Sequence, residues 1–288
     1  MIEWKKIPVK ERKKVYKEKS QGKTLIEKTK MFKGIYEGLE GVCLSTGPSL
    51  LEFPKRKIED FCEGKPVFTI KTATMKFSKI VDVGITNFYN TYQIHSKRKY
   101  IVLARQEMPL NYPNWINQDL IERGTYFNSF IYEPEVLWGS DVTAKHSMSV
   151  CKANRWEENS LDNNPTNRII GPGIMNDMVV PILIHAGLSK VDFLGWDGSD
   201  LNSKGNIKHF YDVETQYKPM MNRVTDRFDL NNLKSDLSEH EQEIGKKAQK
   251  DMLDYFLKNN CTPRILTKNS SVHSAFIRNK ALYLKGKK

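Results

Sequence analysis

The sequence predicts an α/β fold in which a mostly parallel, Rossmann-like sheet carries helices on both faces. Short apolar runs alternate with helical stretches along the chain, as in successive parallel βαβ units with right-handed crossovers. Several of these runs end in turn residues, as buried strands do. The 288 residues, 39% of them hydrophobic and 10% aromatic, suffice for a sizeable core and exclude a disordered chain.

The first half of the chain contains four expected strands. The first strand, Val42–Leu44, is an apolar run that stops at the turn Ser45-Thr46-Gly47-Pro48-Ser49. A helical stretch over Leu50–Cys62, broken by Pro54, connects it to the second strand. The other three strands are expected at Pro66–Ile70, Ile80–Ile85 and Tyr100–Leu103.

The second half begins with a segment of few regular signals, Tyr112–Arg168. An apolar helix is then expected over Ile174–Ala186, kinked at Pro181 and ended by Gly187. A long excursion that forms a lid subdomain, at about 198–237, follows the next strand. The remaining expected elements are a strand at Val191–Gly195, an amphipathic helix over Glu239–Asn259 and a strand at Arg264–Thr267.

The charge lies at the two ends of the chain. The net charge is +12, but residues 1–34 carry +8 and residues 278–288 carry +5, which leaves −1 for the rest. We therefore divide the chain into a basic N-terminal extension (1–40), a Rossmann-like domain (41–277) and a basic C-terminal tail (278–288). The extension is interpreted as a solvated arm partly docked on the domain, with an anionic membrane surface and nucleic acid as alternative partners. The neutral body argues against nucleic acid as the partner.

The cysteines and the apolar runs indicate a cytoplasmic protein. Cys43, Cys62, Cys151 and Cys261 are widely spaced without a CxxC pair, which fits a reducing compartment better than a disulfide scaffold or a zinc site. No apolar run reaches the ~18–20 residues that span a bilayer, and the N-terminus lacks the apolar stretch of a signal peptide. Peripheral contact with the inner face of the membrane stays open, as does a homo-oligomer.

The ligand site of an open parallel sheet lies outside the carboxyl ends of its strands. The most informative of these ends is the turn Ser45–Ser49, where Gly47 permits a close approach and Pro48 fixes the next φ. Ser49 is expected to cap the helix from Leu50 in a capping box with Glu52, which leaves free N–H groups for a phosphate or carboxylate. The alternative is a plain strand–turn–helix connection. Other strand ends are expected at 71–74, 86–90 and 195–200.

Several nucleotide-site motifs are missing from the sequence. Neither GxxxxGK[ST] nor GxGxxG occurs, which disfavours P-loop NTPases and dinucleotide enzymes. Asp197-Gly198-Ser199-Asp200 follows a strand but is more typical of a turn than of a metal site. We therefore expect no metal and no cofactor.

Three colinear segments resemble one group of enzymes. Val42-Cys43-Leu44-Ser45-Thr46-Gly47-Pro48-Ser49-Leu50 resembles the G-x-G-P-S-L segment of the bacterial sialyltransferases of glycosyltransferase family 42. It is also similar to the related family of Maf-type flagellin glycosyltransferases and an archaeal hydroxymethylpterin pyrophosphokinase. The other two segments, similar to that group's S-G-V helix with its I-Y-L-x-G-x-D strand and to its P-N-S strand end, are Gly173–Asp197 and Leu266–Ser271.

The resemblance implies a GT-A-variant-like fold that holds a CMP-activated acidic sugar and transfers it with inversion, without a metal. The sugar is sialic acid or a related acid, and the acceptor is a surface glycan. Gly47 and Ser49 match positions that meet the nucleotide, whereas Thr46 and Lys71 replace a family Asn each. The full set of implied substrate-binding residues is Thr46, Gly47, Pro48, Ser49, Lys71, Asn87, Gly173, Asp197, Tyr211 and Tyr217.

Inverting transfer needs a general base for the acceptor hydroxyl, and histidine suits that task near neutral pH. His185 lies within an apolar helix and is interpreted as a core residue. By resemblance, His209 follows the G-x-D strand at about the Maf-type distance, and His240 lies near the sialyltransferase base. Both stay candidates. Tyr211 and Tyr217 are implied to bind the leaving phosphate, with ordinary lid packing as the alternative.

Two other functions remain open. A nucleotide-dependent pyrophosphokinase or phosphotransferase of the related pterin family would use Mg²⁺ ligands such as Asp197 and Asp200. A non-catalytic nucleic-acid-binding protein would bind through residues 1–34 with a steep salt dependence. The neutral body makes that last function the weakest of the three.

Overall fold

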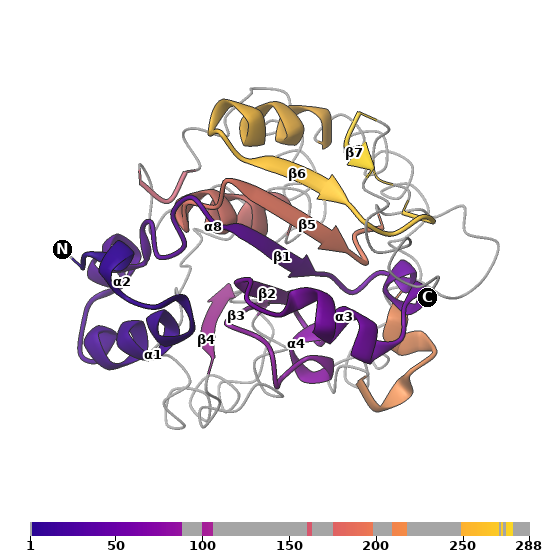
Figure 1. Ribbon diagram of the computed structural model, residues 1–288, viewed down its shortest axis with the longest axis horizontal. Helices are drawn as coiled ribbons and strands as arrows, with labels where there is room; N and C mark the ends of the chain where they lie inside the picture. Colours follow the sequence, from indigo (N-terminus) through magenta and orange to yellow (C-terminus); the bar gives the residue numbers. More distant parts are fainter. Residues whose placement is uncertain are drawn as a thin grey trace, which may run out of the picture.

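The protein is described from a computed structural model. It describes residues 2–87, 100–105, 160–162, 175–197, 209–217, 249–270, 272 and 275–278. Within these residues, seven parallel strands form one sheet in the order β4-β3-β2-β1-β5-β6-β7 (Figure 1). The strands are β1 (Glu40–Leu44), β2 (Val67–Ile70), β3 (Val83–Asn87), β4 (Ile101–Arg105), β5 (Lys190–Leu194), β6 (Thr262–Ile265) and β7 (Ile277–Arg278).

This sheet confirms the predicted α/β class and its parallel strands. Six strands lie at the predicted places, within a few residues at their ends. The seventh, β7, was not predicted because its two residues, one on each side of the expected boundary between domain and basic tail, are too few to form a recognisable apolar run. β7 pairs with β6 and closes that side of the described sheet.

Successive side chains along each strand point to opposite faces of the sheet, and the apolar ones form a hydrophobic core on each face. Cys43, Phe68 and Phe193 point to one core, and Val42, Leu44 and Leu194 point to the other. The first face is covered by α1 (Val9–Ser20), α2 (Leu25–Phe32), α8 (Val180–His185) and the helical residues 249–258. The second is covered by η2 (Pro48–Glu52), α3 (Lys55–Cys62), α4 (Ala73–Lys76) and η4 (Phe210–Asp212).

The helices follow the predictions with three differences. Leu50–Cys62 is not one broken helix, because a 3₁₀ turn (η2) ends at Glu52 and α3 starts only after Pro54. In the apolar stretch before Gly187, the π-helix η3 (Met175–Val179) passes into α8 at Val180, next to Pro181. The short helix α4 was not predicted at all. Gly187 ends α8 with a φ of 82°, as expected for a left-handed terminator.

The N-terminal segment is packed against the sheet. Trp4, in the 3₁₀ turn η1 (Trp4–Lys6), is buried, and its Nε1 donates to the Met31 carbonyl at 3.0 Å. Arg12 is also buried, and its Nη1 donates to the Ile35 carbonyl at 2.8 Å. Tyr16 of α1 and Phe32 of α2 belong to the same hydrophobic cluster as the strands, so α1 and α2 share the core of residues 41–277.

The two edges of the sheet face different parts of the molecule. In Figure 1 the arrows of β1, β5 and β6 point away from α1 and α2 and toward the side where residues 209–217 lie. We call the edge where strands begin the amino edge and the edge where they end the carboxyl edge. No described helix is long and apolar enough to cross a membrane.

Candidate active site

The strand order reverses at β1, which has β2 on one side and β5 on the other. Such a reversal opens a crevice outside the carboxyl ends of the two strands, where ligands of open α/β sheets bind. The turns after β1 and β5 are joined there by hydrogen bonds from the Ser45 amide to the Leu194 carbonyl and from the Gly47 amide to the Gly195 carbonyl, each 2.8 Å long. This part of the carboxyl edge is the candidate active site.

Asp197 is held against the turn after β1. Its Oδ2 accepts from the Ser49 amide at 2.7 Å, and its Oδ1 accepts from the Ser49 hydroxyl. A Cβ atom on Gly47 would overlap Asp197 Oδ2 and lie 2.5 Å from the Gly195 carbonyl oxygen. The φ of Gly47 is −66°, which any residue can adopt, so its backbone conformation does not require glycine. The close approach of the two turns does, because it leaves no room for a Cβ atom.

The environment of Asp197 shifts its acidity in two opposite directions. Burial raises the pKa of the Asp197 carboxyl, because the charged form loses water, and the two hydrogen bonds from Ser49 partly offset this. Asp197 is a hydrogen-bond acceptor for hydroxyl groups whenever it is ionised. It would repel a phosphate placed directly beside it.

The expected capping box at this turn is wrong. The N-cap of η2 is Gly47, without a side-chain cap, and the Ser49 hydroxyl is used by Asp197. Glu52 instead accepts from the amides of Lys268 and Asn269, both at 2.7 Å. The expectation of free N–H groups for an anion also needs correction at Ser49, because that amide already donates to a carboxylate.

Residues 209–217, the described part of the expected lid, are anchored beside the same turn. The Phe210 amide donates to the Thr46 carbonyl at 2.9 Å, and the Phe210 ring is fully buried. Lys76 of α4, with only 4% of its side chain exposed, forms an ion pair with Glu214 at 2.7 Å. The Lys76 ammonium also lies 5.1 Å from the centre of the Phe210 ring. These contacts fix the segment to β1 and α4.

This anchoring brings one predicted base and both predicted tyrosines to the carboxyl edge. The half-buried His209 stacks on the ring of Tyr211, with centroids 4.6 Å apart, and its amide donates to Asp212 at 2.8 Å. Tyr211 is buried, and burial raises the pKa of its phenol well above neutral pH, so it stays a hydrogen-bond donor. Tyr217 packs on Phe210, with centroids 5.9 Å apart.

The other predicted site residues lie at or after the carboxyl ends of β1, β2 and β3, or lie outside the described residues. Lys71 directly follows β2 with a left-handed φ of 49°, and its amide donates to the Ile85 carbonyl at 2.7 Å. Asn87 is the last residue of β3, opposite Arg105 of β4. Pro48 is the first residue of η2. Gly173 and His240 lie outside the described residues, as do Asp200, His95, His146 and His273.

His185 is buried, as predicted for a core residue. Its Nε2 lies 2.8 Å from the Thr29 carbonyl oxygen, and its ring stacks on Phe32. It lies at the amino edge, on the side of the sheet away from the candidate active site.

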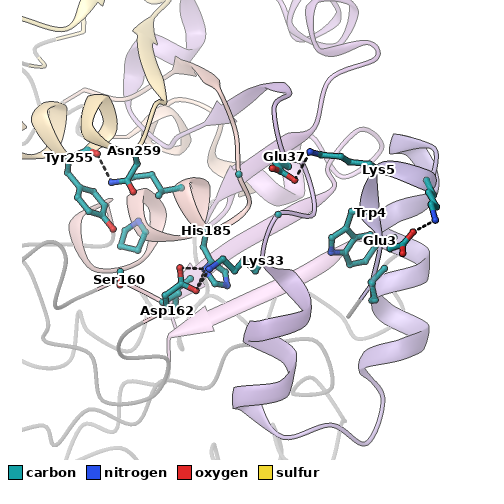
Figure 2. Close-up of a pocket in the computed structure, with 17 residues that line it drawn as sticks. Glu3, Trp4, Lys5, Lys33, Glu37, Ser160, Asp162, His185, Tyr255 and Asn259 are labelled. Atoms are coloured by element: carbon teal, nitrogen blue, oxygen red, sulfur yellow. Dashed lines mark hydrogen bonds and ion pairs between the residues drawn. The ribbon is translucent and has the colours of Figure 1, made fainter.

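A cavity of about 930 Å³ opens beside His185, at the amino edge. Its charged lining is paired internally, as the dashed lines of Figure 2 show for Lys5 with Glu37 and Lys33 with Asp162. The Lys33 ammonium lies 2.9 Å from both oxygens of Asp162. Because these charges are already neutralised by each other, the carboxyl edge remains the better candidate.

The described residues contain no group of three or more His, Cys, Asp or Glu side chains that could hold a metal ion. The part of the site that the sequence did not indicate is the pair Lys76 and Glu214, which are 138 residues apart. No local pattern joins two residues at that separation.

Fold and site together define an α/β protein whose candidate ligand site is the carboxyl edge at the strand reversal. No family model and no curated protein matches the chain. Among solved structures it is similar to the sialyltransferase CstII from Campylobacter jejuni, solved in complex with a substrate analogue, cytidine-5'-monophosphate. The TM-score is 0.44 and the identity 13%, over 85% of this chain and 86% of that one.

Proposed function

We propose that this protein is a glycosyltransferase that binds a nucleotide-activated sugar at the carboxyl edge and uses His209 as the general base. The observation that carries the proposal is the meeting, at the strand reversal, of the Gly47–Ser49 turn, Asp197 and the anchored segment with His209. The sequence resemblance described above involves the same turn and the same strand end. The donor that this resemblance implies is a CMP-activated acidic sugar.

The residue types at this edge match the chemical parts of such a donor. Asp197 offers acceptor oxygens to the hydroxyls of a ribose or sugar ring. Lys71, after the neighbouring strand β2, supplies a cationic residue suited to phosphate. Tyr211 adds a phenol that stays protonated and can donate to the leaving phosphate. The edge thus combines acceptors for hydroxyls with donors for phosphate.

The proposed transfer is a single displacement. The acceptor hydroxyl oxygen attacks the anomeric carbon while the bond from that carbon to the phosphate oxygen breaks, and the nucleotide leaves with the bonding electron pair. His209 takes the proton of the attacking hydroxyl. Such a base contributes about 10²–10⁴-fold to the rate, and its stacking on Tyr211 would keep the imidazole in one orientation.

The test compares His209→Ala with His240→Ala, using CMP release from CMP-sialic acid as the assay. We expect His209→Ala to lower kcat about 10²–10⁴-fold while CMP affinity changes less than threefold, since a base acts on the acceptor. His240→Ala is the matched control on the other predicted base. Loss of activity in His240→Ala alone would transfer the role to His240.

A broader outcome decides the reaction class. If the wild-type protein releases CMP from no CMP-sugar but binds another nucleotide tightly, the proposed donor is wrong. Strict dependence on Mg²⁺ with transfer of a pyrophosphoryl group would instead identify the pyrophosphokinase function. Vesicle sedimentation of the full chain with anionic lipid tests the alternative that residues 1–34 contact a membrane surface, and protein that stays in the supernatant would exclude it.

A further inference from the structure

Three buried hydroxyl groups at the carboxyl edge have no nitrogen or oxygen partner for a hydrogen bond in the part of the chain that the structure describes. They belong to Ser45, Thr72 and Thr267, whose side chains are 5%, 1% and 1% exposed. We call these three residues the hydroxyl row. Only one more hydroxyl among the described residues, that of Tyr36, is buried in the same unpartnered way. The unpartnered hydroxyls therefore gather at the edge that carries the candidate active site.

Strand register places two members of the row level with each other at the strand reversal, and the third follows the neighbouring strand. Leu44 of β1 is opposite Leu194 of β5, so Ser45 lies one step further, level with Gly195. Phe193 of β5 is opposite Ile265 of β6, so Thr267 is level with Gly195 from the other side. Thr72 follows β2, the other neighbour of β1.

The row therefore reaches across four adjacent strands in the order β2, β1, β5, β6. Neighbouring strands lie about 4.8 Å apart, so the row is about 14 Å long. It crosses the strand reversal, with the Asp197 carboxylate at its centre, next to the turn after β1. This length suits an extended ligand.

Leaving a buried hydroxyl without a partner is unfavourable, because the group has given up water and received nothing in return. Elsewhere in the same sheet the protein avoids this cost. The hydroxyl of Thr69 in β2 is fully buried and pairs with the hydroxyl of Thr74 at 2.7 Å. The Ser45 hydroxyl lies beside the thiol of Cys43, which is a weak hydrogen-bonding group.

We propose that the hydroxyl row is a binding subsite for the nucleotide of the donor, with the phosphate and carbonyl oxygens of that ligand accepting from Thr72 and Thr267. This inference rests on the proposed function. Neutral hydroxyls donate without adding charge, so they suit a crevice in which Asp197 already carries one negative charge. Ser45 lies between the two threonines and completes the row.

The experiment measures thermal stability and CMP affinity for Thr72→Val and Thr267→Val in the full chain. The subsite predicts that stability is kept or raised while CMP affinity falls. Valine keeps the shape of threonine and removes the hydroxyl. Without ligand, each variant should melt at the wild-type temperature or up to about 4 °C above it, because an unsatisfied group has been removed. With CMP as the probe in calorimetry, each variant should bind about tenfold more weakly.

Thr69→Val is the matched control. It makes the same change at a hydroxyl that has a protein partner, leaves Thr74 unsatisfied, and should lower the melting temperature by about 2–8 °C. Its affinity for CMP should stay at the wild-type value, because its hydroxyl is used within the protein.

Each outcome decides between the two proposals. If wild type binds CMP and both row variants bind it equally well, the subsite is wrong and the glycosyltransferase proposal stands. If the row variants lose stability as Thr69→Val does, their hydroxyls have protein partners, and the subsite is again wrong. If wild type binds no CMP, the proposed donor fails first and the subsite fails with it.

Discussion

The two edges of the sheet treat their polar groups differently. At and near the amino edge charged side chains pair with each other, as Lys13 does with Asp82 and Lys190 with Glu40. Within the sheet, Arg264 donates from Nε and Nη2 to both oxygens of the fully buried Asp192, at 2.6 and 2.7 Å. The carboxyl edge also has a paired charge, Lys76 with Glu214, but in addition it holds the unpartnered hydroxyl row and a carboxyl group whose pKa is raised by burial.

This difference distinguishes polar groups that stabilise the fold from polar groups that are available to a ligand. A buried group that is fully satisfied by the protein stabilises one fold and has little left for a ligand. A buried group without a partner costs stability, and the cost is recovered when a ligand arrives. The comparison predicts that substitutions near the amino edge change stability alone, whereas substitutions at the carboxyl edge change binding.

The largest effect should come from Arg264→Met. It leaves the buried Asp192 carboxylate without its partner, which should lower the free energy of unfolding by about 3–5 kcal/mol. Urea denaturation measures this change, and CMP affinity of the folded variant should be unaltered. The double variant Arg264→Met/Asp192→Leu should recover most of the loss. A loss below about 1 kcal/mol in the single variant would contradict the assigned role of the pair.

A smaller effect is expected from Gly47→Ala, whose new Cβ would overlap Asp197 Oδ2. The turn must shift, at a cost of about 1–3 kcal/mol, and CMP binding should be lost because the two turns separate. Gly38→Ala is the control at the amino edge, with φ 77° and no atom within 4 Å of its new Cβ. It should cost about 1–2 kcal/mol through its backbone alone and keep full CMP affinity. Equal CMP affinity in both variants would remove the distinction between the edges.

The smallest expected effect is the pH dependence of the unfolding free energy. The contributions of Glu40 at the amino edge and Asp197 at the carboxyl edge should change with pH in opposite directions. A hydrogen bond from Lys190 lowers the pKa of Glu40, so Glu40 stabilises the fold above its unfolded pKa and that contribution is lost as pH falls through its folded pKa. Burial raises the pKa of Asp197, so its contribution is present at low pH and is lost as pH rises through its folded pKa.

Unfolding free energies of wild type, Glu40→Gln and Asp197→Asn, measured between about pH 3 and about pH 7, check these signs. The unfolding free energy of wild type minus that of Glu40→Gln should grow as pH rises. The corresponding difference for Asp197→Asn should shrink. Slopes of the same sign in both comparisons would show that the two carboxyl groups are not in opposite environments.

Sequence patterns predicted the strands well because each apolar run is local and ends at a turn. They also predicted that Gly47 permits a close approach, but not what approaches it, because Asp197 is 148 residues from Ser49. The Ser49–Glu52 spacing fits a capping box, yet tertiary contacts with Asp197 and the 268–269 backbone replaced it. The hydroxyl row could not be predicted, since Ser and Thr near a turn are common and burial without a partner is a property of the fold.

The place of β1 in the sheet has a consequence for synthesis of the chain. β1 pairs with β2 soon after both are made, but its other partner, β5, follows about 150 residues later, the separation of Glu40 and Lys190. At about 5–20 residues per second, the second side of β1 waits roughly 8–30 s for its partner on the ribosome. During that time a central strand of the finished sheet presents an open hydrogen-bonding edge, at which a nascent chain of this protein is open to chaperones and to aggregation.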